Sequence, residues 1–159
     1  MKDIKLEVYY KLAQPDELSA ADKELVEKAK AATAHSYSNY SHFCVGAAVR
    51  LSDGSIVIGA NQENAAFPSG LCAERTAVFA AQAQHPEYDI TALAIAARND
   101  AGFTKRPISP CGACRQVILE VEDRYKKPVR ILLYGEQGIY IFSSVKDMLP
   151  FCFTDDDMR

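Results

Sequence analysis

Three cysteines constrain this chain more than any other feature of its sequence. Cys72 is followed thirty-nine residues later by Cys111, and Cys114 comes three residues after that. A fold that brings the two segments together can hold one zinc ion on three thiolates. Zinc sites with three protein ligands keep a fourth position for water and are catalytic, whereas structural sites are closed by a fourth ligand. The spacing therefore favours a catalytic zinc site built from two separate segments.

A carboxylate accompanies the first of these cysteines. Glu74 lies two residues after Cys72, close enough to share its pocket without binding the metal. A carboxylate beside an activated water can carry protons during a reaction. Three thiols together with this glutamate indicate hydrolytic deamination of a base.

The charge of such a site needs compensation. Three thiolates and one Zn²⁺ sum to a negative charge, which is unfavourable for acidifying a bound water. Both cysteine segments fall at expected helix starts, where backbone N–H groups stabilise thiolates. Arg75 and Arg115 each follow a cysteine closely. We expect both to donate hydrogen bonds to the sulfurs and so to return positive charge to them.

The cysteine pattern alone leaves other interpretations open. The pair Cys111 and Cys114 also fits half of a structural zinc site or a redox pair. Cys44 and Cys152 would supply a fourth thiol by count, but each lies in an apolar stretch, where a buried free thiol is the usual state. A zinc module that only binds a partner would retain the metal and leave Glu74 dispensable.

Size and composition are those of one globular domain. The 159 residues suffice to bury roughly two thirds of the unfolded surface, and residues 1–159 are expected to form a single unit in which 1–13 is an extension of unknown role. No apolar run is long enough to span a membrane, and the charged start lacks the apolar core of a signal peptide. We therefore expect a cytoplasmic protein with reduced thiols and no membrane partner. A net charge of −3 without a basic block argues against a nucleic-acid partner.

The order of the expected elements predicts an α/β fold. Strands are expected over 45–51, 56–58, 90–97, 129–133 and 139–142, and helices from Ser19 towards Tyr37 and over 73–83, 114–125 and 145–149. Helices that alternate with strands predict a three-layer α/β/α arrangement around a mixed five-stranded sheet. The zinc site would lie at the N-termini of two helices. The first dozen residues alternate imperfectly and fit either a strand or an irregular arm.

Five ordered segments resemble the small cytidine deaminases of pyrimidine salvage. They are residues 40–48, 59–65, 72–77, 108–116 and 149–150, and together they extend over most of the chain. They fit the general zinc-deaminase pattern of a His or Cys ligand, a non-ligand Glu and Pro-Cys-x-x-Cys. The resemblance implies a zinc-dependent hydrolase with Zn²⁺ on Cys72, Cys111 and Cys114. Its reaction would convert cytidine and deoxycytidine to uridine and deoxyuridine plus ammonia.

The resemblance also implies roles for individual residues. Glu74 would hold N3 of the base and move protons while water activated by zinc attacks C4. Asn61 and Glu63 would bind the ribose hydroxyls, because a carboxylate and an amide on one loop recognise a diol and repel a phosphate. Phe43 would pack against the pyrimidine ring, and the backbone of Ala65 would read the base edge.

The same resemblance implies a homotetramer and an alternative substrate class. Phe153 matches the aromatic residue that relatives contribute from a neighbouring subunit. The chain departs from the family at Cys44, where relatives usually have proline, and at Phe67, where they often have tyrosine. The alternative interpretation is a related zinc deaminase that acts on a nucleoside antibiotic, a nucleotide or a polynucleotide. Cysteine as the first ligand and the loop of residues 61–64 favour a free nucleoside instead, because Glu63 would repel a phosphate.

Overall fold

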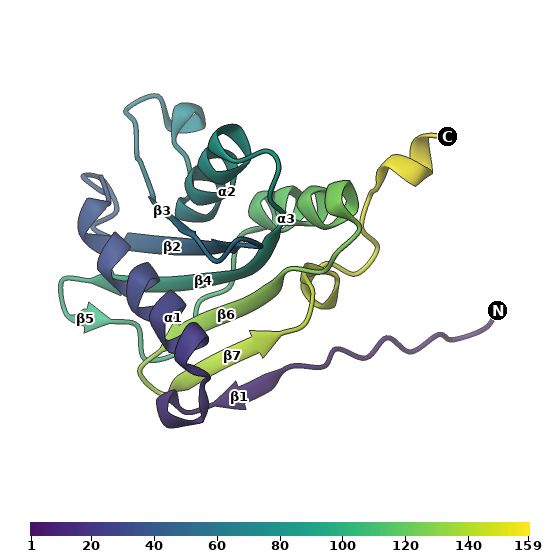
Figure 1. The fold of residues 1–159 in the computed structure, drawn as a ribbon, viewed down its shortest axis with the longest axis horizontal. Helices are drawn as coiled ribbons and strands as arrows, with labels where there is room; N and C mark the ends of the chain where they lie inside the picture. Colours follow the sequence, from purple (N-terminus) through teal and green to yellow (C-terminus); the bar gives the residue numbers. More distant parts are fainter.

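The computed structural model describes residues 1–159 and contains one mixed sheet with helices on both faces (Figure 1). The strand order is β1-β7-β6-β4-β2-β3, and β5 pairs with β4 outside this path. Strands β4 and β6 run parallel, while the other paired strands are antiparallel. The strands are β1 (Lys11–Ala13), β2 (Cys44–Leu51), β3 (Ile56–Ala60), β4 (Ile90–Asn99), β5 (Gly102–Phe103), β6 (Arg130–Gly135) and β7 (Gly138–Phe142). The α/β class and the mixed sheet expected from the sequence are confirmed.

The sheet has seven strands, so the expected number of five was too small. All five expected strands are present, as β2, β3, β4, β6 and β7. The two additional strands are short, since β1 has three residues at the sheet edge and β5 has two residues beside the end of β4. Segments of this length hold too few alternations to produce a periodic signal.

The three α-helices are divided between the two faces of the sheet. Helix α1 (Ala20–Ala32) covers one face, and α2 (Ala73–Gln84) and α3 (Gly112–Tyr125) cover the other (Figure 1). Strand β4 shows why: Leu93 and Ile95 point to the core under α2 and α3, while Ala94 points to α1. The 3₁₀ helices are η1 (Pro15–Glu17), η2 (Thr33–His35), η3 (Phe67–Ser69), η4 (Val145–Met148) and η5 (Asp155–Met158). No helix is both long and apolar enough to cross a membrane.

Two glycines allow the helices to approach the sheet closely. A Cβ atom at Gly46 in β2 would collide with the carbonyl oxygen of Ala29 in α1. A Cβ atom at Gly59 in β3 would collide with the amide nitrogen of Ala77 in α2. Because these are backbone atoms of packed helices, a larger residue would have to displace the helix. Gly59 thereby sets how close the first turns of α2 come to the sheet.

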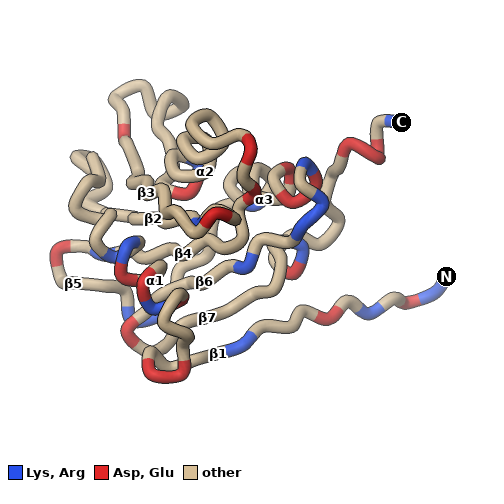
Figure 2. Tube along the Cα trace, viewed as in Figure 1, with Lys and Arg blue, Asp and Glu red and all other residues tan.

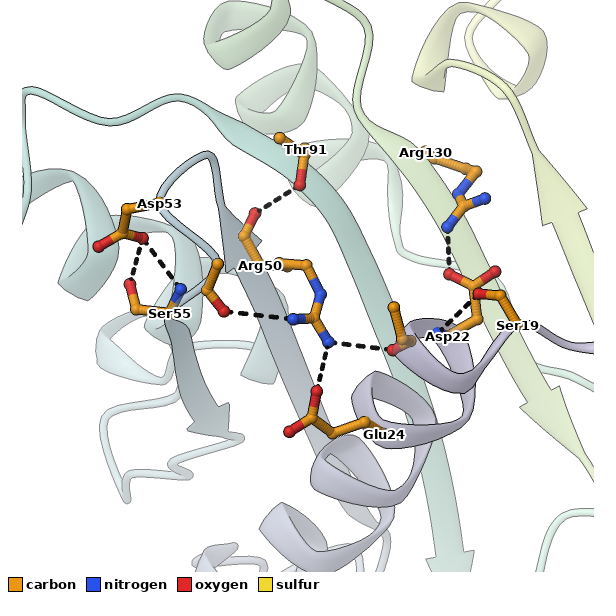
Figure 3. Close-up of polar contacts among 10 residues, drawn as sticks. Ser19, Asp22, Glu24, Arg50, Asp53, Ser55, Thr91 and Arg130 are labelled. Atoms are coloured by element: carbon orange, nitrogen blue, oxygen red, sulfur yellow. Dashed lines mark hydrogen bonds and ion pairs between the residues drawn. The ribbon is translucent and has the colours of Figure 1, made fainter.

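Polar contacts fix the start of α1 against the strands (Figure 3). The Ser19 hydroxyl caps the helix by accepting a hydrogen bond of 3.1 Å from the Asp22 amide. The buried Asp22 carboxylate pairs with Arg130 of β6. Arg50 of β2 donates to Glu24 over 2.8 Å. These contacts join α1 to both halves of the sheet.

A buried glutamate ties α3 to the segments that follow it. Glu122 is only 5% exposed, and its Oε1 accepts hydrogen bonds of 2.9 Å from the amides of Val129 and Val145. Its Oε2 accepts from the Ser144 hydroxyl over 2.7 Å. One carboxylate therefore joins the end of α3 to the start of β6 and to η4.

Candidate metal centre

The three cysteines of the sequence pattern meet at the starts of two neighbouring helices. Cys72 is the N-cap residue of α2, Cys111 is the N-cap residue of α3, and Cys114 lies in the first turn of α3. Because α2 and α3 cover the same face of the sheet, their N-termini can meet (Figure 1). The expected placement at two helix N-termini is confirmed.

The distances among the sulfur atoms suit one divalent cation. All three Sγ atoms lie within 4.8 Å of one another. The Cys72 and Cys111 sulfurs are 3.9 Å apart, and those of Cys111 and Cys114 are 3.5 Å apart. Tetrahedral zinc with Zn–S bonds of about 2.3 Å requires sulfur separations of about 3.8 Å. The donor set therefore fits zinc, and the thiols are free, not joined as a disulfide.

The cluster contains three ligand side chains and no fourth. No further His, Cys, Asp or Glu ligand atom belongs to the group. The Cys44 sulfur lies 3.2 Å from the Ser38 hydroxyl, and Cys152 packs against the core beneath α3. Neither completes a four-cysteine site, so the three thiols fit an open zinc centre and not a closed structural one.

The electrostatics of the thiols also call for a cation. Burial raises the pKa of the Cys111 thiol, but the Cys114 amide and the neighbouring thiols lower it more, so that the net pKa lies below its ordinary value. Burial and then the charge of Glu74 raise the pKa of Cys114 well above its ordinary value. If all three groups were thiolates at these distances, they would need a positive charge among them, which a divalent metal would supply.

The two arginines expected beside the sulfurs make different contacts. Arg75 donates from Nη2 to the Cys72 sulfur over 3.5 Å, and this bond raises the pKa of the guanidinium. Arg115 donates instead to two backbone carbonyls, those of Pro110 at 2.9 Å and Met148 at 2.6 Å. Arg75 therefore touches a ligand sulfur, whereas Arg115 joins the segment before Cys111 to η4.

Glu74 lies in the first turn of α2 and is only 4% exposed. Burial raises its pKa, while the positive charge of Arg75 opposes the shift. A carboxyl group with a raised pKa holds a proton more readily than a surface glutamate, which suits a group that accepts a proton and then releases it.

A pocket of about 480 Å³ opens beside Cys72. Its lining includes Asn61 and Glu63 from the loop after β3 and Cys72 and Arg75 from the start of α2. Phe67 also lines it and makes an edge-to-face contact with Tyr40 at 5.6 Å between ring centroids. The volume is in the range of small-molecule sites.

The Asn61 side chain holds the pocket wall together. Its Oδ1 accepts from the Ser36 hydroxyl at 2.5 Å and from the Val45 amide at 2.8 Å. Its Nδ2 donates to the Phe43 carbonyl at 2.9 Å. Oδ1 thus has two protein donors, while Nδ2 has a second hydrogen available for a ligand.

Glu63 is held in its ionised form by the loop opposite. The Ser41 hydroxyl donates to Oε1 at 2.5 Å, and the Tyr40 amide donates to Oε2 at 2.8 Å. These hydrogen bonds hold the pKa of Glu63 below its ordinary value, and the bond from the Ser41 hydroxyl has the largest effect. The pocket therefore carries a fixed negative charge on this side.

The remaining expected contact residues, Phe43, Ala65 and Phe153, are not among those that line this pocket. Phe43 is half-buried next to β2, and Ala65 is exposed in the loop before η3. Phe153 is 58% exposed, and its carbonyl accepts from Gln116 of α3 over 2.8 Å. Within one chain Phe153 is not among the residues that line the pocket of Asn61 and Glu63.

Sequence reasoning missed the residues that orient the pocket side chains. Ser36 and Ser41 are the partners of Asn61 and Glu63, and they lie more than twenty residues earlier in the chain. Ser41 stands inside the segment that resembles the deaminases, which is the only signal that marked it. A serine in a polar loop has no periodicity that identifies its partner.

Comparisons with known proteins agree with this geometry. Residues 19–128 match the family described as the cytidine and deoxycytidylate deaminase zinc-binding region. A cytidine deaminase of Halalkalibacterium halodurans is 41% identical over 85% of this chain and 96% of its own length. A crystal structure of cytidine deaminase from Burkholderia pseudomallei is similar with a TM-score of 0.69 and 40% identity, over 82% of this chain and 97% of that one. A blasticidin-S deaminase of Bacillus cereus is 27% identical over 86% of this chain and 95% of its own length.

Proposed function

Because this chain belongs to the cytidine and deoxycytidylate deaminase family of zinc-binding enzymes, we propose that it deaminates cytidine and deoxycytidine in pyrimidine salvage. The products would be uridine or deoxyuridine and ammonia. The observation that carries the proposal is the open cluster of three thiols beside the buried Glu74, at the edge of a pocket lined by Asn61 and Glu63. Five free thiols fit work in the reducing cytosol.

Cys72, Cys111 and Cys114 would hold one zinc ion per chain. Bound zinc would lower the pKa of a water molecule and so prepare it for attack on the base. The helix N-termini and the Arg75 guanidinium stabilise the thiolates by placing positive charge next to the sulfurs. Arg115 does not contact a sulfur atom; it positions Cys111 indirectly, because it holds the backbone before Cys111 in place.

Glu74 would move both protons of the reaction. It first accepts a proton from the attacking water and delivers it to N3 of the base as the new C4–O bond forms. It then takes the second proton from the added hydroxyl group and passes it to the amine, so that the C4–N bond breaks and ammonia leaves. The raised pKa of the buried carboxyl suits both transfers.

The pocket side chains would select a free nucleoside. The free hydrogen on Asn61 Nδ2 and the ionised Glu63 suit the hydroxyl groups of a ribose. Phe43 would pack against the pyrimidine ring, and the Ala65 backbone would meet the base edge. A phosphate next to Glu63 would be repelled, because both groups are anionic.

A second candidate substrate is a nucleoside antibiotic that carries a cytosine base. The similarity to the blasticidin-S deaminase supports this candidate. Phe67 supports it as well, because a phenylalanine on the pocket wall offers no hydroxyl group to the sugar.

One assay separates these candidates. Purified zinc-loaded protein is incubated in parallel with cytidine, deoxycytidine, their monophosphates, adenosine and blasticidin S, and ammonia release is followed. We expect turnover of cytidine and deoxycytidine only. Turnover of blasticidin S alone would favour the antibiotic, and turnover of the monophosphates would contradict the role given to Glu63.

A substitution tests the proton carrier. Glu74→Gln should retain one zinc per chain but lose turnover by about 10²–10⁴-fold or more, because it removes the group that transfers protons. The matched control is Glu120→Gln, an exposed glutamate of α3 that should keep full activity. Full activity in Glu74→Gln would exclude the proposed role.

We further propose a homotetramer in which Phe153 approaches the pocket of a neighbouring subunit. The exposure of Phe153, and its position outside the pocket of its own chain, support this arrangement. Phe153→Ala should raise KM for cytidine while zinc content stays unchanged. A fully active monomer in sedimentation velocity would contradict the tetramer.

A further inference from the structure

The first ten residues form an extended arm that leaves the edge of the sheet (Figure 1). Strand β1 pairs with β7, with Lys11 opposite Ile141, but β7 ends at Phe142. Residues 1–9 make no backbone hydrogen bond to the rest of the chain. Their amide and carbonyl groups are therefore open to a partner strand on either side.

The arm has the side-chain pattern of a strand with one apolar face. Ile4, Leu6, Val8 and Tyr10 alternate with polar residues, and they are 87%, 61%, 47% and 53% exposed. Tyr10 stacks on Phe142 with ring centroids 5.3 Å apart. This contact directs the even-numbered residues to the face of the sheet that α3 covers, since Phe142 belongs to that core. An apolar face so exposed indicates that the arm has a partner.

The odd-numbered residues carry opposite charges: Lys5 and Glu7 pair within one arm, and they can pair equally between two copies of it. Asp3, Lys5 and Glu7 alternate in sign along the arm, as Figure 2 shows. If the arm pairs antiparallel with its own copy about Leu6, Lys5 lies opposite Glu7 on both sides of the twofold axis. Ile4 then lies opposite Val8, so the apolar face is continuous. Opposed charges and opposed apolar residues both stabilise an antiparallel pair.

Neighbouring registers are unfavourable. Sliding the copy by two residues in one direction places Lys5 opposite Lys5 and Asp3 opposite Glu7. Sliding it by two in the other direction places Glu7 opposite Glu7. Like charges directly opposite are destabilising, and a slip by one residue would set apolar against polar faces. Pairing about Ile4 would also oppose Asp3 and Lys5, but it sets Lys2 opposite Leu6 and so interrupts the apolar face. Only the register about Leu6 opposes both the charges and the apolar residues, as a self-complementary twofold interface requires.

We propose that residues 1–10 of two copies of this chain pair as an antiparallel β-ribbon centred on Leu6. The ribbon continues the sheet of each copy beyond β1 and links the two sheets across a twofold axis. It adds an interaction surface distinct from the metal centre, because the residues of the arm take no part in lining the pocket.

Charge reversal tests the ribbon. Lys5→Glu and Glu7→Lys each place like charges opposite each other, whereas the double variant Lys5→Glu/Glu7→Lys restores both pairs. Lys2→Glu is the matched control for Lys5→Glu, because it makes the same change in net charge but Lys2 lies opposite Tyr10. The readout is the dissociation constant of the chain, measured by sedimentation at low salt. A variant that lacks residues 1–10 gives the association of the rest of the chain without the arm.

Each single reversal should weaken the association due to the arm by about fivefold or more. The double variant and a mixture of the two single variants should recover it, and Lys2→Glu should change it less than twofold. The proposal is overturned if removal of residues 1–10 leaves association unchanged, or if the single and double variants behave alike.

Cross-linking reports the register directly. Mild oxidation of a zinc-loaded Leu6→Cys variant should give a covalent dimer, because residue 6 lies opposite itself. Ile4→Cys should give far less alone but should cross-link to Val8→Cys when the two are mixed. Equal cross-linking of Ile4→Cys and Leu6→Cys, or of the unsubstituted chain, would exclude the register.

Discussion

The buried carboxylate of Glu122 gives the most quantitative prediction of the fold. Glu122→Ala removes three hydrogen bonds and leaves the amides of Val129 and Val145 without a partner. Both valines are fully buried, so water does not replace the lost acceptor. Each unsatisfied buried group costs about 1–3 kcal/mol, and the variant should lose about 3–5 kcal/mol of unfolding free energy. That is a large part of the roughly 5–15 kcal/mol available to a domain.

Two further variants make this estimate specific. Glu122→Gln keeps an oxygen for the two amides and a polar group for Ser144, and it should lose only about 1–2 kcal/mol. Glu120→Ala on the exposed side of α3 should change stability by less than about 0.5 kcal/mol.

The assay is urea unfolding of the zinc-loaded proteins at one fixed concentration. With a slope of about 2 kcal/mol/M, Glu122→Ala should lower the urea midpoint by about 2 M. A midpoint within about 0.3 M of the parent, or equal loss of stability in Glu122→Gln and Glu122→Ala, would show that Glu122 does not hold these segments together.

The other predictions concern the surroundings of the metal centre. Arg75→Ala should weaken zinc binding by about 10–100-fold in a chelator competition, and unchanged affinity would contradict its contact with sulfur. Gly59→Ala should lower zinc content and the melting temperature, because the added Cβ collides with the first turns of α2, whereas Gly112→Ala has open space and should keep both. Ser41→Ala should raise the pKa of Glu63 towards its ordinary value, since a donor to the carboxylate is lost. Because the pKa of Glu63 is lowered in the folded protein, any stability that the ionised carboxylate contributes is present above its unfolded pKa and is lost as pH falls through its folded pKa. The pKa of Glu63 is measured by carbon NMR titration, and the same pKa in Ser41→Ala as in the parent would contradict the role of the Ser41 hydroxyl.

The sequence identified the elements that build the metal centre because their signals are local. The Ala-rich run after Cys72 predicts α2, and the cysteines fall where helix starts are expected. Strand β4 is recognisable as a buried apolar run that ends near Asn99. Helix propensity, apolar alternation and cysteine spacing each act over a few residues, so they can be read without knowing the tertiary structure.

Contacts between distant segments could not be predicted in the same way. Arg115 and Arg75 look alike in sequence, but only the structure places Arg75 on sulfur and Arg115 on the carbonyls of Pro110 and Met148. Glu122 looks like an ordinary helix charge, although it is buried against segments that follow it. The partner of each side chain depends on how the elements pack, and packing leaves no local periodic trace.

The central claim is that three thiolates, and no fourth protein ligand, hold one zinc ion. Zinc K-edge X-ray absorption on the purified protein, with metal analysis of the same sample, measures this directly. The account predicts one zinc per chain, three sulfur neighbours at about 2.3 Å and one oxygen neighbour. Four sulfur neighbours, or a disulfide between Cys111 and Cys114 in place of bound metal, would contradict it.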